Sequence, residues 1–96
     1  MFLEIITPES KIFSGNADAV QLPGKDGLFQ LLDHHAPMIS TLAEGRVKVD
    51  LPDSAKKIDG LSGRIENDKS NDRVIYMSIT GGVVEVQNNK VILLAE

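Results

Sequence analysis

The amino-acid sequence predicts an all-β fold, a sandwich or a barrel, on three observations. The dominant hydrophobic period is two: Val47, Val49 and Leu51 alternate with charged residues. Turn-forming Gly, Pro, Asn and Asp recur roughly every 8–12 residues between short β-branched runs. No segment carries a sustained apolar stripe with the 3.6-residue period of a helix. Such a pattern is typical of short strands joined by tight turns.

Five short strands are expected in the first half of the chain, each followed by turn residues. Their expected positions are residues 2–6, 11–14, 17–22, 28–32 and 37–42. Thr7-Pro8 ends the first and Pro23-Gly24 the third, because proline has no backbone N–H to donate to a sheet.

In the second half of the chain, strands are expected at residues 46–51, 75–80, 83–87 and 91–94. The last two form a hairpin, since Asn88-Asn89 separates them and asparagine tolerates the left-handed backbone of a tight turn. Gly81-Gly82 is expected to be a bulge or bend.

Residues 52–73 depart from this rhythm. They are dense in polar residues, with Ile58, Leu61 and Ile65 as isolated apolar positions. We expect a long solvated loop inserted into one β-sandwich domain spanning residues 1–96; a specific binding loop is the alternative.

Composition excludes several classes of function. A net charge of -4, with no run of basic residues beyond Lys56-Lys57, makes nucleic acid a poor partner. There is no cysteine, hence no disulfide or thiolate site. The N-terminus lacks the basic start of a signal peptide, and no apolar run approaches the ~20 residues of a membrane helix. Contact with a membrane would therefore have to be indirect, through another chain.

The two histidines of the chain stand together in Asp33-His34-His35. Adjacent strand residues point to opposite faces, so a metal site completed by Asp33 would need a bent turn. Pro37 instead favours a structural corner, where His35 could bond the backbone through a ring nitrogen. No nucleophile elbow, phosphate loop or carboxylate pair is present. We expect no catalytic residue, no cofactor and no metal.

Four ordered segments together resemble the epsilon subunit of F-type ATP synthase. They are residues 3–15, 20–42, 44–49 and 79–96. The family's motifs fall on Thr7-Pro8, Phe13-Ser14-Gly15, Gly27, His35-Ala36-Pro37-Met38 and Gly81-Gly82-Val83-Val84-Glu85-Val86. The resemblance covers residues 1–51 and 74–96.

The resemblance implies a two-sheet antiparallel β-sandwich of about ten strands. It also implies a non-catalytic rotor subunit at the foot of the central stalk, in a complex with the alpha and beta subunits. Such a subunit binds gamma and the c-ring and couples ion translocation to ATP synthesis. It would lie at the cytoplasmic face of the bacterial plasma membrane. The residues expected near gamma are Thr7, Pro8 and Ser10, and those expected near the ring are Gly27, Leu28, His35 and Met38.

Several departures from the family pattern matter. Asp33-His34 stands where Pro-Gly is common, and Leu28 stands where many members carry an acid. The loop at 52–73 is longer than the usual hairpin. The helical hairpin that normally follows the last strand is absent after Glu96, so inhibition or ATP sensing through it is not expected. The alternative function is a free-standing β-sandwich ligand-binding module, which predicts an exposed aromatic platform.

Overall fold

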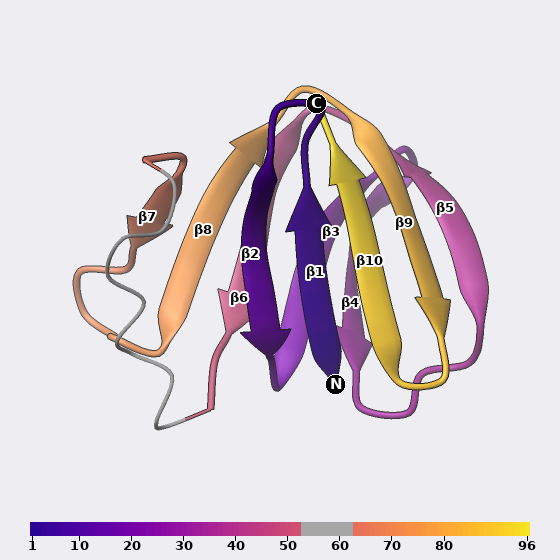
Figure 1. Cartoon of the computed structure of the whole chain (residues 1–96), viewed down its shortest axis with the longest axis horizontal. Helices are drawn as coiled ribbons and strands as arrows, with labels where there is room; N and C mark the ends of the chain where they lie inside the picture. The colour runs from indigo at the N-terminus through magenta and orange to yellow at the C-terminus, as the bar shows by residue number, and fades with distance from the viewer. Residues whose placement is uncertain (53–62) are drawn as a thin grey trace.

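The computed structural model describes residues 1–52 and 63–96, and all of the regular structure in them is β-strand. Figure 1 shows the ten strands. They are β1 (Phe2–Ile6), β2 (Lys11–Asn16), β3 (Ala19–Gly24), β4 (Gly27–Leu32), β5 (Met38–Leu42), β6 (Gly45–Asp50), β7 (Ile65–Asn67), β8 (Val74–Ile79), β9 (Gly82–Gln87) and β10 (Lys90–Ala95). No helix in the described residues could cross a membrane.

The strands form two layers, which confirms the predicted sandwich (Figure 1). One layer has the strand order β2-β1-β10-β9-β5, and the other has the order β4-β3-β6-β8-β7. The layers join where Leu42 of β5 pairs with Gly24 of β3. All pairs are antiparallel except β1 with β10, which run parallel from Phe2↔Lys90 to Ile6↔Leu94.

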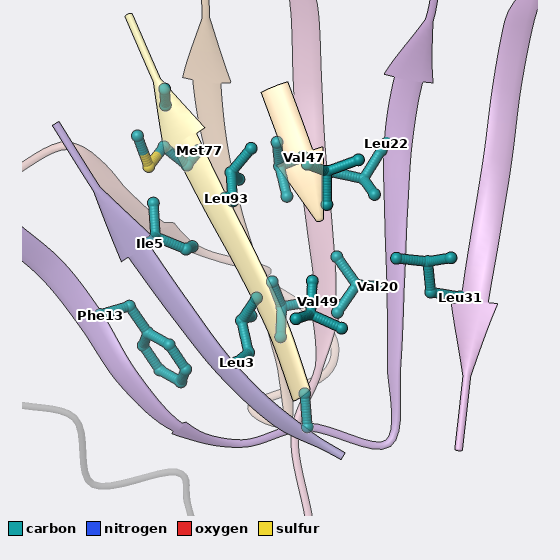
Figure 2. Close-up of a cluster of buried hydrophobic side chains, with 14 of the residues drawn as sticks. Leu3, Ile5, Phe13, Val20, Leu22, Leu31, Val47, Val49, Met77 and Leu93 are labelled. Carbon is teal, nitrogen blue, oxygen red and sulfur yellow. The ribbon is translucent and has the colours of Figure 1, made fainter. Parts of the chain in front are cut away.

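The hydrophobic core lies between the two layers. Alternate side chains of each strand point inward, so Val47, Val49 and Leu51 are buried as their spacing predicts. Figure 2 shows Leu3, Ile5 and Leu93 of one layer facing side chains of the other. This packing holds the sheets in one arrangement and positions the strand ends described below.

Two predicted turns have the geometry that their residues favour. Asn88 and Asn89 have φ values of 55° and 58°, as expected for the hairpin joining β9 to β10. The chain bends at Thr80, directly before the Gly81-Gly82 pair, and Gly82 has a positive φ of 155°, in agreement with the expected bend.

The structure corrects the strand limits at Pro23. Strand β3 does not end before this proline but continues through Gly24. The Pro23 carbonyl accepts a 2.8 Å hydrogen bond from the N–H of Ala43, on the side of β3 away from β4. Pro23 therefore sits at a position whose N–H would not have bonded β4, and proline is tolerated there.

The polar segment 52–73 is not loop throughout. Ile65–Asn67 forms β7, which pairs with β8, and the N–H of Leu51 donates a 2.7 Å bond to the carbonyl of Arg73. Its other apolar positions, Ile58 and Leu61, lie outside the described residues.

The sandwich has two ends, which we name for later use. The groove end carries the C-terminus, the end of β1, the turn between β3 and β4, the end of β5 and the connection from β8 to β9, at the top of Figure 1. The histidine end carries Met1, the segment between β4 and β5, and the β9–β10 hairpin, at the bottom of Figure 1.

Candidate functional site

An apolar groove of about 590 Å³ lies at one end of the layer formed by β2, β1, β10, β9 and β5, which we call the first layer. This groove gives the groove end its name. It is lined by parts of five separate segments: Ile6, Thr7, Pro8, Lys25, Thr41, Leu42, Gly81, Gly82, Val83, Leu94, Ala95 and Glu96. A volume of this size is within the range of binding sites in proteins. We take this groove as the candidate site.

A compact turn at Thr7 forms one wall of the groove. Thr7 is buried although it is polar, and its hydroxyl donates to the Ser10 carbonyl at 3.1 Å. The Thr7 N–H donates to the same carbonyl at 2.9 Å, and the Ser10 N–H points back to the Thr7 hydroxyl at 3.3 Å. These bonds satisfy the buried threonine and hold Pro8 at the groove.

Gly82 brings β9 against the end of β10. A Cβ atom at Gly82 would lie 2.4 Å from the Leu94 carbonyl oxygen, which no side chain could tolerate. Its positive φ is a second reason for glycine. The close approach allows the Glu96 N–H to donate to the Gly81 carbonyl at 3.1 Å, which closes this wall.

The apolar surface continues from the groove across the outer face of the first layer. The strand register places Ile6, Leu94, Val83 and Thr41 in one row across β1, β10, β9 and β5. Leu94 is 50% exposed, and Ile39, on the same face of β5, is 71% exposed. An apolar row of this kind is typical of the centre of a protein interface.

Charged side chains lie at the edge of this apolar row. The Glu4 carboxylate accepts from Lys11 Nζ at 2.9 Å and lies 3.4 Å from Lys90 Nζ. The hydrogen bond from Lys11, with the charges of both lysines, lowers the pKa of Glu4. Lys25 and Glu96 stand at the groove itself. A charged rim around an apolar centre completes the anatomy of a protein-binding surface.

The predicted gamma-side residues all lie at this site. Thr7 and Pro8 line the groove, and Ser10 closes the turn that holds them. The structure therefore brings the three together in the manner that their clustering in the sequence suggests.

The predicted ring-side residues do not form one surface. Gly27 and Leu28 begin β4 at the groove end, where Leu28 is 66% exposed. His35 and Met38 lie beyond the other end of β4, at the histidine end. The remaining four residues of β4, 29–32, separate Leu28 from the histidine end.

The histidine segment forms the predicted corner. The His35 N–H donates to the Leu32 carbonyl at 3.2 Å, and His35 Nδ1 donates to the Ala36 carbonyl at 2.8 Å. This confirms the predicted bond from the ring to the backbone. The carboxylate of Asp33 instead pairs with the Met1 ammonium, whose hydrogen bond lowers the pKa of Asp33. In the described segments, no three His, Asp or Glu side chains are grouped to hold a metal ion.

The sequence patterns do not predict most of the groove, including Lys25, Thr41 and Leu94. These residues come from distant segments, and only the register of β1, β10, β9 and β5 brings them together. One signal was available: the run Val91-Ile92-Leu93-Leu94 is apolar on both faces of its strand, so one of those faces had to meet something other than solvent.

The comparisons with known proteins agree on one family. Residues 1–65 match the family described as "ATP synthase, Delta/Epsilon chain, beta-sandwich domain". The chain is 39% identical over 94 residues to an ATP synthase epsilon chain of Chlorobium limicola, covering 98% of this chain and 86% of that one. It is 38% identical over 94 residues to that of Chlorobaculum tepidum, with the same coverage. The match to that of Maridesulfovibrio salexigens is 33% over 96 residues and spans 54% of the relative.

Two solved structures show the same fold. A chain in the central stalk and c-ring structure of the Tetrahymena thermophila mitochondrial ATP synthase superposes with a TM-score of 0.67 at 13% identity. This match covers 99% of the present chain and 62% of that one. A chain of the Euglena gracilis mitochondrial ATP synthase superposes with a TM-score of 0.70 at 16% identity, covering 97% and 48%.

Proposed function

Because this chain belongs to the family of ATP synthase delta/epsilon chains, whose β-sandwich domain it carries, we propose that it is a non-catalytic subunit of the central stalk. In this role it binds gamma and the c-ring and couples ion translocation to ATP synthesis by the alpha and beta subunits. The observation that carries the proposal is the apolar groove, with its continuous apolar row and charged rim.

The groove is the proposed gamma site. Burying Leu94 and Ile39, both at least half exposed in the free chain, would provide a hydrophobic contribution to binding. Thr7 and Pro8 contribute a rigid wall because their turn is closed by internal bonds. A surface that needs little ordering on association loses less entropy when it binds.

The proposed ring contact is the start of β4, at Gly27 and Leu28. The turn that joins β3 to β4 contains Lys25, which lines the groove, so this contact lies at the same end of the sandwich as the groove. Leu28 would contribute apolar contact where an acid in other members would contribute charge. A ring contact through His35 and Met38 would require a second surface at the histidine end. Contact with the ring would hold the chain at the cytoplasmic face of the bacterial plasma membrane.

The sandwich suits a part that transmits torque without performing chemistry. Its two layers share one close-packed core, and protein interiors compress little under load. A force applied at the groove end is therefore carried through both sheets together.

Affinity purification from detergent-solubilised membranes of the native cells tests the proposal. We expect mass spectrometry to find gamma, alpha and beta subunits with the tagged chain. Leu94→Glu should lose gamma because it places a charge in the apolar row, whereas Ser78→Glu, at an exposed position on the other layer, should retain it. Recovery of the unmodified chain alone in mild salt would contradict the proposal.

A free-standing ligand-binding module is the second candidate, and the volume of the groove is the observation that favours it. The aromatic platform that it predicts is not formed. All four aromatic residues lie in the described segments; Phe13 is buried, Phe29 and Tyr76 are half-buried, and Phe2 alone is exposed. Saturable binding of a small sugar that Leu94→Glu abolishes, without any recovery of gamma, would favour this alternative.

A further inference from the structure

Strand β4 is an edge strand that lacks the usual protection against pairing. It pairs with β3 on one side, and no strand within residues 1–52 or 63–96 pairs with its other side. Its sequence, GLFQLL, contains no charge and no proline. Natural proteins usually protect such an edge with one of these, because an open edge is a template for another strand.

The other outer edges are protected or short. Strand β2 carries Lys11, and β7 has three residues and carries Glu66. Strand β5 is also uncharged, but Pro37 precedes it and Leu42 ties its end to β3. Among the described strands, β4 therefore offers the longest unprotected edge.

The backbone groups on the open edge can be identified from the register. Pro23 is paired with Leu28, and its carbonyl points away from β4 to the Ala43 N–H. The pair Pro23–Leu28 is thus a non-hydrogen-bonded pair, and such pairs alternate along an antiparallel ladder. The N–H and C=O groups of Leu28, Gln30 and Leu32 therefore face away from β3.

Most of the outward-facing backbone groups of β4 have no bonding partner in the part of the chain that the structure describes. Among the N–H and C=O groups of Leu28, Gln30 and Leu32, the Leu32 carbonyl accepts a hydrogen bond from the His35 N–H. The same three residues have exposed side chains, with Leu28 66% and Leu32 54% exposed. An added strand would gain both backbone bonds and apolar contact along one continuous line.

This edge is complementary to itself. A twofold axis at Gln30 would pair Gln30 with its own copy, and Leu28 with Leu32 of the second copy. Apolar side chains would meet apolar ones, and two amides would meet at the centre. The strand itself carries no charge, so no like charges would be placed opposite each other within the paired segment.

We propose that the occupant of this edge is a second copy of the chain, in a twofold dimer built by antiparallel pairing of β4 with β4. The central Gln30 pair supplies two backbone bonds, and each Leu28–Leu32 pair supplies further bonds on either side. A contact between single strands is small compared with a stable protein interface, so the dimer is weak and forms as concentration rises. It does not depend on the function proposed above.

Sedimentation of the purified chain over a wide range of concentration tests the dimer. We expect reversible monomer–dimer behaviour. Gln30→Lys and Gln30→Glu should each raise the dimer Kd by about fivefold, because the twofold axis sets like charges opposite each other. A mixture of the two variants should restore association, as a heterodimer. Gln30→Pro removes an N–H that has no bonding partner within residues 1–52 and 63–96, and it should weaken the dimer by about tenfold or more.

Ser78→Lys is the matched control, since it adds the same charge on the outer face of the same layer, away from β4. Its dimer Kd should equal that of the unmodified chain. A chain that stays monomeric at every concentration would overturn the proposal. So would a dimer that is unaffected by the charges at Gln30 or broken by Leu94→Glu instead.

Discussion

The backbone N–H of His34 donates a 2.7 Å hydrogen bond to Asn89 Oδ1, although the two residues lie 55 positions apart. Both have left-handed backbones, with φ values of 63° and 58°. The bond ties the corner after β4 to the hairpin between β9 and β10. It therefore links one layer of the sandwich to the other at the histidine end.

Replacing each asparagine of the hairpin by glycine tests the contribution of the Asn89 side chain. Both positions have positive φ, so glycine suits the turn at either one. Asn89→Gly loses the bond to His34 and the side-chain hydrogen bond to Asp33, whereas Asn88→Gly loses neither. We expect the free energy of unfolding of Asn89→Gly to be lower than that of Asn88→Gly by about 0.5–1.5 kcal/mol. Urea unfolding of both variants measures the difference, and equal stabilities would show that the side-chain bonds of Asn89 contribute nothing.

His34→Gly should stabilise the chain. A non-glycine residue in the left-handed region costs about 1–2 kcal/mol, partly offset by the greater freedom of glycine in the unfolded chain. A gain of about 0.5–1 kcal/mol is expected, since the backbone bond to Asn89 is kept. His35→Gly, at a neighbouring position outside the left-handed region, is the control and should destabilise. Thermal or urea unfolding measures the stability of both variants. A loss of stability in His34→Gly would show that the left-handed backbone at this position does not cost the folded chain free energy.

Gly82→Ala should be strongly destabilising. The added methyl group would meet the Leu94 carbonyl and force the ends of β9 and β10 apart. We expect a loss of about 2–3 kcal/mol in the free energy of unfolding. Gly63→Ala is the control, because a Cβ there meets no atom within 4 Å. If both variants unfold at the same urea concentration, the close approach at Gly82 is not a real constraint.

The carboxylate of Glu4 should contribute to stability in a pH-dependent way. Its pKa is lowered in the folded chain, first by the hydrogen bond from Lys11 and then by the charges of Lys11 and Lys90. The contribution is present above the unfolded pKa, near 4.5, and is lost as the pH falls through the lower folded value. Glu4→Gln should lower the melting temperature at neutral pH and have a smaller effect in acid. High salt should reduce the difference, because the group is near the surface. An effect of Glu4→Gln that is independent of pH would rule out the charge as its cause.

Local pattern was enough to predict much of the sheet. The alternation at Val47, Val49 and Leu51 and the turn at Asn88-Asn89 are local signals, and both are confirmed. The parallel pairing of β1 with β10 was not predicted, because nothing in either strand specifies a partner at the other end of the chain. The strand limit at Pro23 was missed because the tolerance for proline depends on which way its carbonyl points.

The groove depends still more on long-range pairing. Thr7 and Pro8 were expected at an interface from the family resemblance, and the structure places both in the groove wall. The separation of Leu28 from His35 could not be foreseen from the motif that carries both, since a strand of six residues sets them at opposite ends. Proximity in the sequence and proximity in the fold diverge along an extended strand.

The pairing of β1 with β10 has a consequence for biosynthesis. Strand β1 leaves the ribosome before the other nine described strands, yet one of its two neighbours consists of residues 90–95. Leu3 and Ile5 cannot bury their side chains against Leu93 until that segment has been translated. Until then the nascent first layer has an open position between β1 and β9. Folding of the sandwich should therefore finish only after β10 has been translated, because the first layer is incomplete without it.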